Sequence, residues 1–200
     1  IAEFISDQKK VAGTCTVSLI DFDDVIESKF GPDDIHNFGQ YLIHPRNGTA
    51  LYDAIAKGIH STESYVTGLA PADQPEKVII VIVTDGQESG ASKEYKHHDV
   101  KSLVDRVEKG SGWQIVFIGA DINAAVVTDT LGIRNVSNYA GGQAKSVGGV
   151  YSGLSAATAT FRTTGVMDAN FNVAADGTVV NTVASGVIVD DVINTRNATI

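Results

Sequence analysis

Residues 78–83 read Val-Ile-Ile-Val-Ile-Val, and this unbroken β-branched run constrains the fold more than any other part of the sequence. A run without a polar face predicts a strand that is buried on both sides, as in a parallel sheet covered by helices. Residues 113–120, Trp-Gln-Ile-Val-Phe-Ile-Gly-Ala, predict a second buried strand. The chain therefore needs helices on both faces of a sheet that contains these two strands.

The segments around these two runs alternate between helical and strand patterns. Leu51, Ile55 and Ile59 recur every four residues and define the buried stripe of one helix. Helices are predicted near 1–10, from 48 onward, at 98–109, 122–131 and 143–162, and further strands at 14–22, 25–30 and 135–139. This alternation predicts an α/β fold with a doubly wound, mostly parallel sheet. A hairpin formed by the strands at 14–22 and 25–30 would make one edge antiparallel.

The character of the sequence changes after Gly165. Residues 166–200 are rich in Val, Thr and Asn and carry no helical stripe. We predict short strands at 178–183 and 186–189. The chain is accordingly divided into an α/β domain at 1–165 and a β-prone extension, or the start of a further domain, at 166–200.

Composition narrows the classes of partner. Hydrophobic residues make up 43% of the chain, which is enough for a packed core, and Cys15 is the only cysteine, so the fold has no internal disulfide. The formal net charge of -9 opposes the binding of nucleic-acid phosphates. No apolar run reaches the ~20 residues that a membrane helix needs. We therefore expect protein partners, with no nucleic acid and no insertion into a membrane.

Thr49 and Asp85 are the candidate metal ligands. Asp85 ends the strand at 78–83, and Thr49 lies where a helix begins. Ligands of open α/β sheets bind beyond the carboxyl ends of the strands. A hydroxyl and a carboxylate are hard oxygen ligands, suited to Mg²⁺ or Mn²⁺ with waters completing the shell. The same residues also fit a helix cap and a turn residue, and both interpretations stay open at this point.

Two stretches resemble von Willebrand factor A (vWA) domains. Residues 47–55, Asn-Gly-Thr-Ala-Leu-Tyr-Asp-Ala-Ile, resemble the family's G-[ST]-T-x-L-x-D-A-[IL] motif, and residues 78–86 resemble its hydrophobic strand ending in T-D-G. Residues 117–121, 131–133 and 138–139 are most similar to bacterial and phage members. The resemblance covers about residues 1–165 and implies the family's Rossmann-like α/β fold.

The resemblance also implies a metal-ion-dependent adhesion site. In the family this site combines a D-x-S-x-S loop with a threonine, matched by Thr49, and an aspartate, matched by Asp85. Its cation captures an acidic residue of a partner protein. The resemblance therefore implies a protein-binding module that uses Mg²⁺ or Mn²⁺ and is not an enzyme.

The sequence departs from the family in one respect, because it contains no D-x-S-x-S motif and no counterpart of the first strand. One explanation is a longer polypeptide in which this segment precedes Ile1. Another is that a second chain or the C-terminal segment donates the strand, and residues 187–191, Val-Ile-Val-Asp-Asp, would provide one that ends in acid. The third is a degenerate site.

Two functions of different classes follow. The first is a protein-interaction or adhesion module, metal-assisted and part of an oligomer or larger assembly. The alternative is a structural scaffold of a phage virion or other large assembly, with the C-terminal segment pairing with other chains. We expect no enzymatic activity, because the sequence holds no Gly-x-Ser-x-Gly motif and no phosphate-binding loop.

Overall fold

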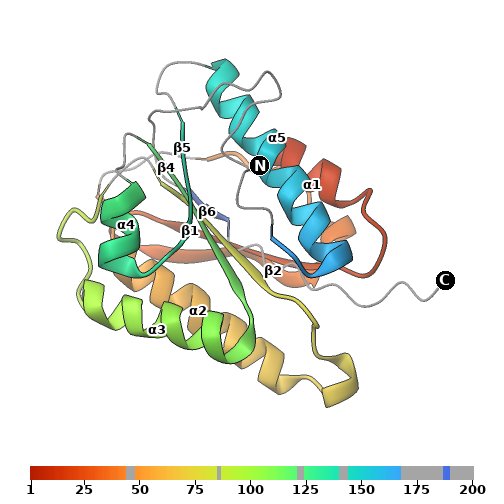
Figure 1. Ribbon diagram of the computed structural model, residues 1–200, viewed down its shortest axis with the longest axis horizontal. Coiled ribbons are helices and arrows are strands. Elements are labelled where there is room, and N and C mark those ends of the chain that lie inside the picture. Colours follow the sequence, from red (N-terminus) through yellow and green to blue (C-terminus); the bar gives the residue numbers. More distant parts are fainter. Residues whose placement is uncertain (44–47, 85–86, 121–123, 140–143, 168–186, 190–200) are drawn as a thin grey trace.

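The computed structural model describes residues 1–43, 48–84, 87–120, 124–139, 144–167 and 187–189. Within these residues six strands form one sheet, and helices pack on both of its faces (Figure 1). The predicted α/β class is confirmed. In this part of the chain no helix combines the length and the apolar character needed to cross a membrane.

The sheet is mixed. Its strands are β1 (Thr16–Phe22), β2 (Ile26–Asp34), β3 (Ile79–Thr84), β4 (Gln114–Ala120), β5 (Asn135–Tyr139) and β6 (Val187–Val189). They lie in the order β2-β1-β6-β3-β4-β5. β3, β4 and β5 are parallel, whereas β2 and β6 run antiparallel to their neighbours. The more specific expectation of a doubly wound, mostly parallel sheet is therefore not confirmed.

Two layers of helices cover the sheet. The helices are α1 (Ala2–Gln8), α2 (Leu51–Gly68), α3 (His97–Ser111), α4 (Ala124–Leu131) and α5 (Ala144–Thr164). α1 and α5 lie on one face, and α2, α3 and α4 lie on the other (Figure 1). Each falls where the sequence predicts a helix.

β3 explains why both layers are needed. Alternate residues of a strand point to opposite faces. Ile79, Val81 and Val83 pack in the core beneath α1 and α5, whereas Ile80 and Ile82 pack in the core beneath α2, α3 and α4. All five side chains are at most 3% exposed, so the β-branched run is buried on both faces, as predicted.

β1 and β2 form the predicted hairpin, but β2 is longer than expected. Phe22 pairs with Ile26 at the turn, and the ladder continues past an irregularity to Thr16 opposite Asp34. Gly31 makes this possible, since its φ is 68° and a Cβ there would lie 2.1 Å from the carbonyl oxygen of Val17. Pairing therefore continues beyond residue 30, where the predicted strand ends.

β6 lies in the middle of the described sheet. Val187 pairs with Val83 and Val189 with Val81, while Ile188 also pairs with Ile20 of β1. The strand predicted at 186–189 thus exists, whereas the one predicted at 178–183 falls outside the described residues. Residues 187–189, from the segment that the sequence offers as a substitute strand, lie in the centre of the described sheet, antiparallel to both neighbours.

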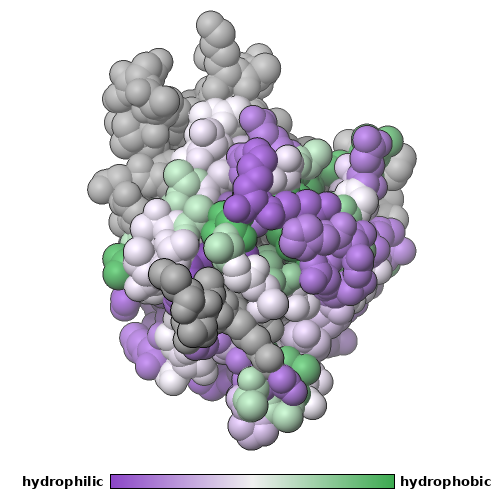
Figure 2. Space-filling model, turned by 90° about the vertical axis from the view of Figure 1, so that its right-hand side faces the viewer, coloured by the Kyte–Doolittle hydropathy of each residue, from purple (hydrophilic) through white to green (hydrophobic). Residues whose placement is uncertain are grey.

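The surface is largely polar on the face shown in Figure 2, where hydrophobic residues form small, separated groups. The large hydrophobic side chains with the greatest exposure among the described residues are far apart in the sequence, Leu42 at 74% and Val166 at 65%. Individual exposed hydrophobic residues are ordinary for a folded protein.

Candidate functional site

The candidate site lies at the carboxyl ends of β1 and β3, which run in the same direction because each is antiparallel to β6. The residues before α2 and the loop after β3 meet at this edge. Thr49 is half-buried one residue before the N-cap of α2. Asp85, the other predicted metal ligand, lies outside the described residues. The structure therefore places one of the two predicted ligands.

Hydrogen bonds join the loop after β3 to the segment that carries Thr49. The Thr49 amide donates to Ser89 Oγ at 2.9 Å, and the Ser89 amide donates to the Thr49 carbonyl oxygen at 3.2 Å. Ser89 follows Asp85 by four positions, and Thr84, immediately before Asp85, ends β3. The two loops that carry the predicted ligands are thus fastened to each other.

The β1–β2 turn forms the third part of this edge. The Ala50 amide donates to the Asp23 carbonyl oxygen, and the Asp23 carboxylate accepts the Val25 amide at 2.6 Å. Gly48 adopts a φ of 93°, and a Cβ there would come within 3.2 Å of Asp24 Cβ. The close approach of the turn therefore requires glycine at position 48.

The first turn of α2 is capped by distant residues. Ala50 occupies the N-cap and has no polar side chain, so the first amides of the helix need other acceptors. The Tyr52 amide donates to Glu88 Oε2 at 3.2 Å and to Ser92 Oγ at 3.1 Å, and the Asp53 amide donates to Ser92 Oγ at 3.2 Å. The loop after β3 therefore supplies the cap that the local sequence lacks.

Glu88 is held in its charged form. Burial raises the pKa of this carboxyl, but hydrogen bonds from the Ser92 side chain and from the amides of Ser92, Tyr52 and Gly90 outweigh it, so the pKa lies below its usual value. The Ser92 hydroxyl donates at 2.6 Å. A carboxylate beside the first turn also favours the helix dipole. The pKa of the Tyr52 phenol is raised, first by burial and second by the negative charge of Glu88.

Asp53 shapes the rest of the loop. Its carboxylate accepts the amides of Lys93 at 2.7 Å, Glu94 at 3.1 Å and Tyr95 at 2.8 Å. A carboxylate that accepts three backbone donors fixes their path firmly, because each bond is charge-assisted. Residues 93–95 are thereby held against α2.

The side chains at this edge determine which metal ion could bind there. Within the described parts of the chain, no three His, Cys, Asp or Glu side chains come close enough to hold an ion. Glu88 and Asp53 are already engaged by backbone donors. The Thr49 hydroxyl and the Asp85 carboxylate would supply oxygen ligands to a bound ion, and Mg²⁺ commonly binds through one or two such groups while keeping several waters. The chemistry of this pair fits Mg²⁺ or Mn²⁺.

Sequence reasoning missed the residues that hold the edge together, Glu88, Ser89 and Ser92. The sequence feature that could have identified them was their residue type, since hydroxyl and carboxylate side chains after a buried strand are suited to capping. Their partner is a helix whose first turn lies 36 to 40 positions earlier. Local patterns do not reveal such a distant pairing.

No family model, curated protein or solved structure matches this chain. Its function is therefore inferred from the geometry of the edge formed by the β1–β2 turn, the start of α2 and the loop after β3.

Proposed function

We propose that this chain is a protein-binding module of the vWA type, with its binding surface at the carboxyl edge of the sheet and no catalytic activity of its own. The observation that carries the proposal is the pair of hydrogen bonds between Thr49 and Ser89, which fastens the loop after β3 to the start of α2. Ligands of open α/β sheets bind at this edge.

The finer fold assignment belongs to the same proposal. A doubly wound, vWA-like sheet is supported by the parallel β3, β4 and β5, by the antiparallel hairpin at one edge and by helices on both faces. The resemblance of residues 47–55 and 78–86 to the family motifs is the second support.

The proposed cofactor is Mg²⁺ or Mn²⁺, held by the Thr49 hydroxyl and the Asp85 carboxylate with waters as the other ligands. A bound cation supplies a position that accepts a carboxylate of a partner protein. The other polar residues at this edge position the loops that carry the ligands. Ser89 fixes the backbone of Thr49, and Glu88 and Asp53 hold the loop after β3 on α2.

The test compares thermal unfolding with and without Mg²⁺ in the wild type, Thr49→Val and Asp85→Asn. Both variants keep the shape of the side chain, and Thr49→Val removes the hydroxyl ligand whereas Asp85→Asn removes the negative charge of the carboxylate. At a Mg²⁺ concentration a hundredfold above the Kd, binding stabilises the wild type by about 2.7 kcal/mol, and both variants lose this shift.

Thr67→Val and Asp129→Asn are the matched controls. Both residues are exposed, Thr67 in the last turn of α2 and Asp129 on α4, and both variants keep the wild-type response to Mg²⁺. A shift of wild-type size in both Thr49→Val and Asp85→Asn would refute the metal role.

A structural scaffold of a phage virion or other large assembly is the second candidate, favoured by the strand-forming character of the C-terminal residues, whose β6 pairs with β1 and β3 of the same chain. Such a segment would pair with other chains in an assembly. Ile188→Pro removes a backbone donor needed for strand pairing. If the scaffold role holds, light scattering finds large assemblies of the wild type that this variant does not form, and monomeric wild type at every concentration speaks against it.

A further inference from the structure

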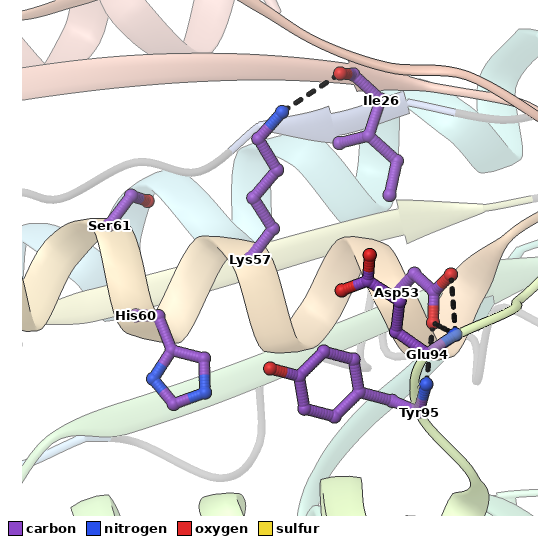
Figure 3. A pocket seen from close by; sticks show the side chains of 7 residues that line it. All are labelled: Ile26, Asp53, Lys57, His60, Ser61, Glu94 and Tyr95. Atoms are coloured by element: carbon purple, nitrogen blue, oxygen red, sulfur yellow. Dashed lines mark hydrogen bonds between the residues drawn. The ribbon is translucent and has the colours of Figure 1, made fainter.

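The β1–β2 hairpin lies against α2, and Lys57 joins the two near the hairpin turn. Its Nζ donates to the Ile26 carbonyl oxygen of β2 at 2.9 Å (Figure 3). One turn further along the helix, at Ser61, a cavity of about 50 Å³ lies between α2 and the hairpin. Residues of α2, β1 and β2 all line it, so the cavity is part of the contact between helix and hairpin.

The hairpin is irregular at the wall of this cavity. The ladder between β1 and β2 shifts register between Val17 and Leu19. The intervening Ser18 faces two residues of β2, Gly31 and Pro32, and all three line the cavity. Two residues opposite one form a β-bulge, which interrupts the regular hydrogen bonds of a ladder. Proline also has no amide hydrogen to donate. Regular strand pairing therefore does not continue through this wall.

Thr62 supplies a buried hydroxyl on the helix side of the cavity. The residue is 2% exposed and, within the part of the chain that the structure describes, its Oγ1 is buried and has no hydrogen-bond partner. Ser61 and Thr67 of the same helix donate instead to carbonyl oxygens of the preceding turn, at 3.0 Å and 2.7 Å. Buried hydroxyl groups in folded proteins are nearly always bonded, either to the protein or to ordered water.

The size of the cavity selects the class of ligand. Sites for small organic molecules measure about 300–1,000 Å³, so a cavity of about 50 Å³ is too small for them. A water molecule needs about 10–15 Å³ and two to four polar partners. Ser18, Ser28 and Tyr65, which also line the cavity, carry further hydroxyl groups. Both the volume and the polarity of the wall therefore suit water.

We propose that this cavity binds at least one long-lived water molecule, which bonds to Thr62 Oγ1 and bridges α2 to the bulge of the β1–β2 hairpin. A bridging water is nearly as favourable as a direct hydrogen bond, and it adapts to an irregular backbone. The proposal is independent of the proposed function. It means that the hairpin is fixed to α2 at two points, by Lys57 near the turn and by water at the bulge.

Oxygen-17 relaxation dispersion of the water signal counts long-lived waters and does not respond to the exchange of hydroxyl protons. Thr62→Val keeps the shape of the side chain but removes the hydroxyl, and we expect it to lose at least one long-lived water relative to the wild type. Thr62→Ser retains the hydroxyl and should retain the water. Thr67→Val is the matched control, because it changes an exposed threonine of the same helix and should also keep the wild-type count.

The urea midpoint of unfolding is the second readout. If the Thr62 hydroxyl had no partner, its replacement by a methyl group would raise the midpoint, because an unsatisfied buried polar group costs stability. We expect Thr62→Val to lower the midpoint instead, by about 0.5 M. The proposal is overturned if Thr62→Val keeps every long-lived water of the wild type, if its midpoint does not fall, or if Thr67→Val loses as many waters.

Discussion

At the scale of single residues, Glu88 does the work of a helix cap without belonging to the helix. Its carboxylate accepts the amide of Tyr52, 36 positions earlier, and both the amide and the hydroxyl of Ser92. Burial would favour the neutral acid, but these donors together favour the carboxylate and lower its pKa. The first turn of α2 is therefore stabilised by a negative charge that comes from another part of the chain.

The stability that Glu88 provides should depend on pH. Because the folded protein lowers the pKa from its ordinary value of 4.5, the contribution is complete above that value and is lost as the pH falls through the folded pKa. Glu88→Gln should lower the free energy of unfolding by about 1 kcal/mol at pH 7, and the difference should shrink as the pH falls below 4.5.

Urea unfolding of both proteins at pH 7 and at pH 3 measures this difference. Glu3→Gln, an exposed change in the first turn of α1, is the control and should have little effect at either pH. If Glu88→Gln lowered the free energy of unfolding equally at both pH values, the role of the charge would be contradicted.

At the scale of elements, α2 and the loop after β3 form one unit, since Asp53 binds three consecutive amides of that loop. Asp53→Asn replaces one carboxylate oxygen by a donor, so at least one of the amides of Lys93, Glu94 and Tyr95 loses its acceptor. We expect a loss of about 1–3 kcal/mol in stability and faster hydrogen exchange at these amides. Unchanged exchange at all three would show that other contacts hold the loop.

The elements themselves were largely predictable from the sequence, whereas the site was not. Residues 78–83 carry the signal for β3 within a few positions, because their β-branched side chains have to be buried on both faces. The extension of β2 beyond residue 30 depends on the approach of Gly31 to Val17, which no local pattern contains. Likewise, Thr49 stood out in the sequence, but its partner Ser89 is 40 positions away.

At the scale of the whole molecule, Arg162 joins the last described helix to the first. It is 4% exposed on α5, and its guanidinium donates to the carbonyl oxygen of Gln8 at 2.6 Å, at the end of α1. Gln8 in turn donates to the Ser155 carbonyl oxygen at 3.0 Å. Burial lowers the pKa of Arg162, and the carbonyl groups at the end of α1 provide the compensating negative dipole.

Arg162→Met keeps the length of the side chain but removes the buried guanidinium that donates to the Gln8 carbonyl oxygen at the end of α1. We expect a loss of about 2–3 kcal/mol in the free energy of unfolding, measured with urea. Arg106→Met is the matched control, because Arg106 forms an exposed ion pair with Glu63 and should cost less than about 1 kcal/mol. Equal losses in the two variants would show that the buried position of Arg162 does not matter.

The distant cap of α2 also sets an order of events during synthesis. Tyr52 leaves the ribosome 40 residues before Ser92, an interval of roughly two to eight seconds at about 5–20 residues per second. Until residues 88–92 have been synthesised, the first amides of the helix lack the side-chain acceptors that cap them in the folded protein. A nascent chain that ends at Thr84 would contain all of α2 and β3 and still lack the acceptors that complete the helix. The cap of α2, on one face of the sheet, is therefore completed only after translation has moved past β3.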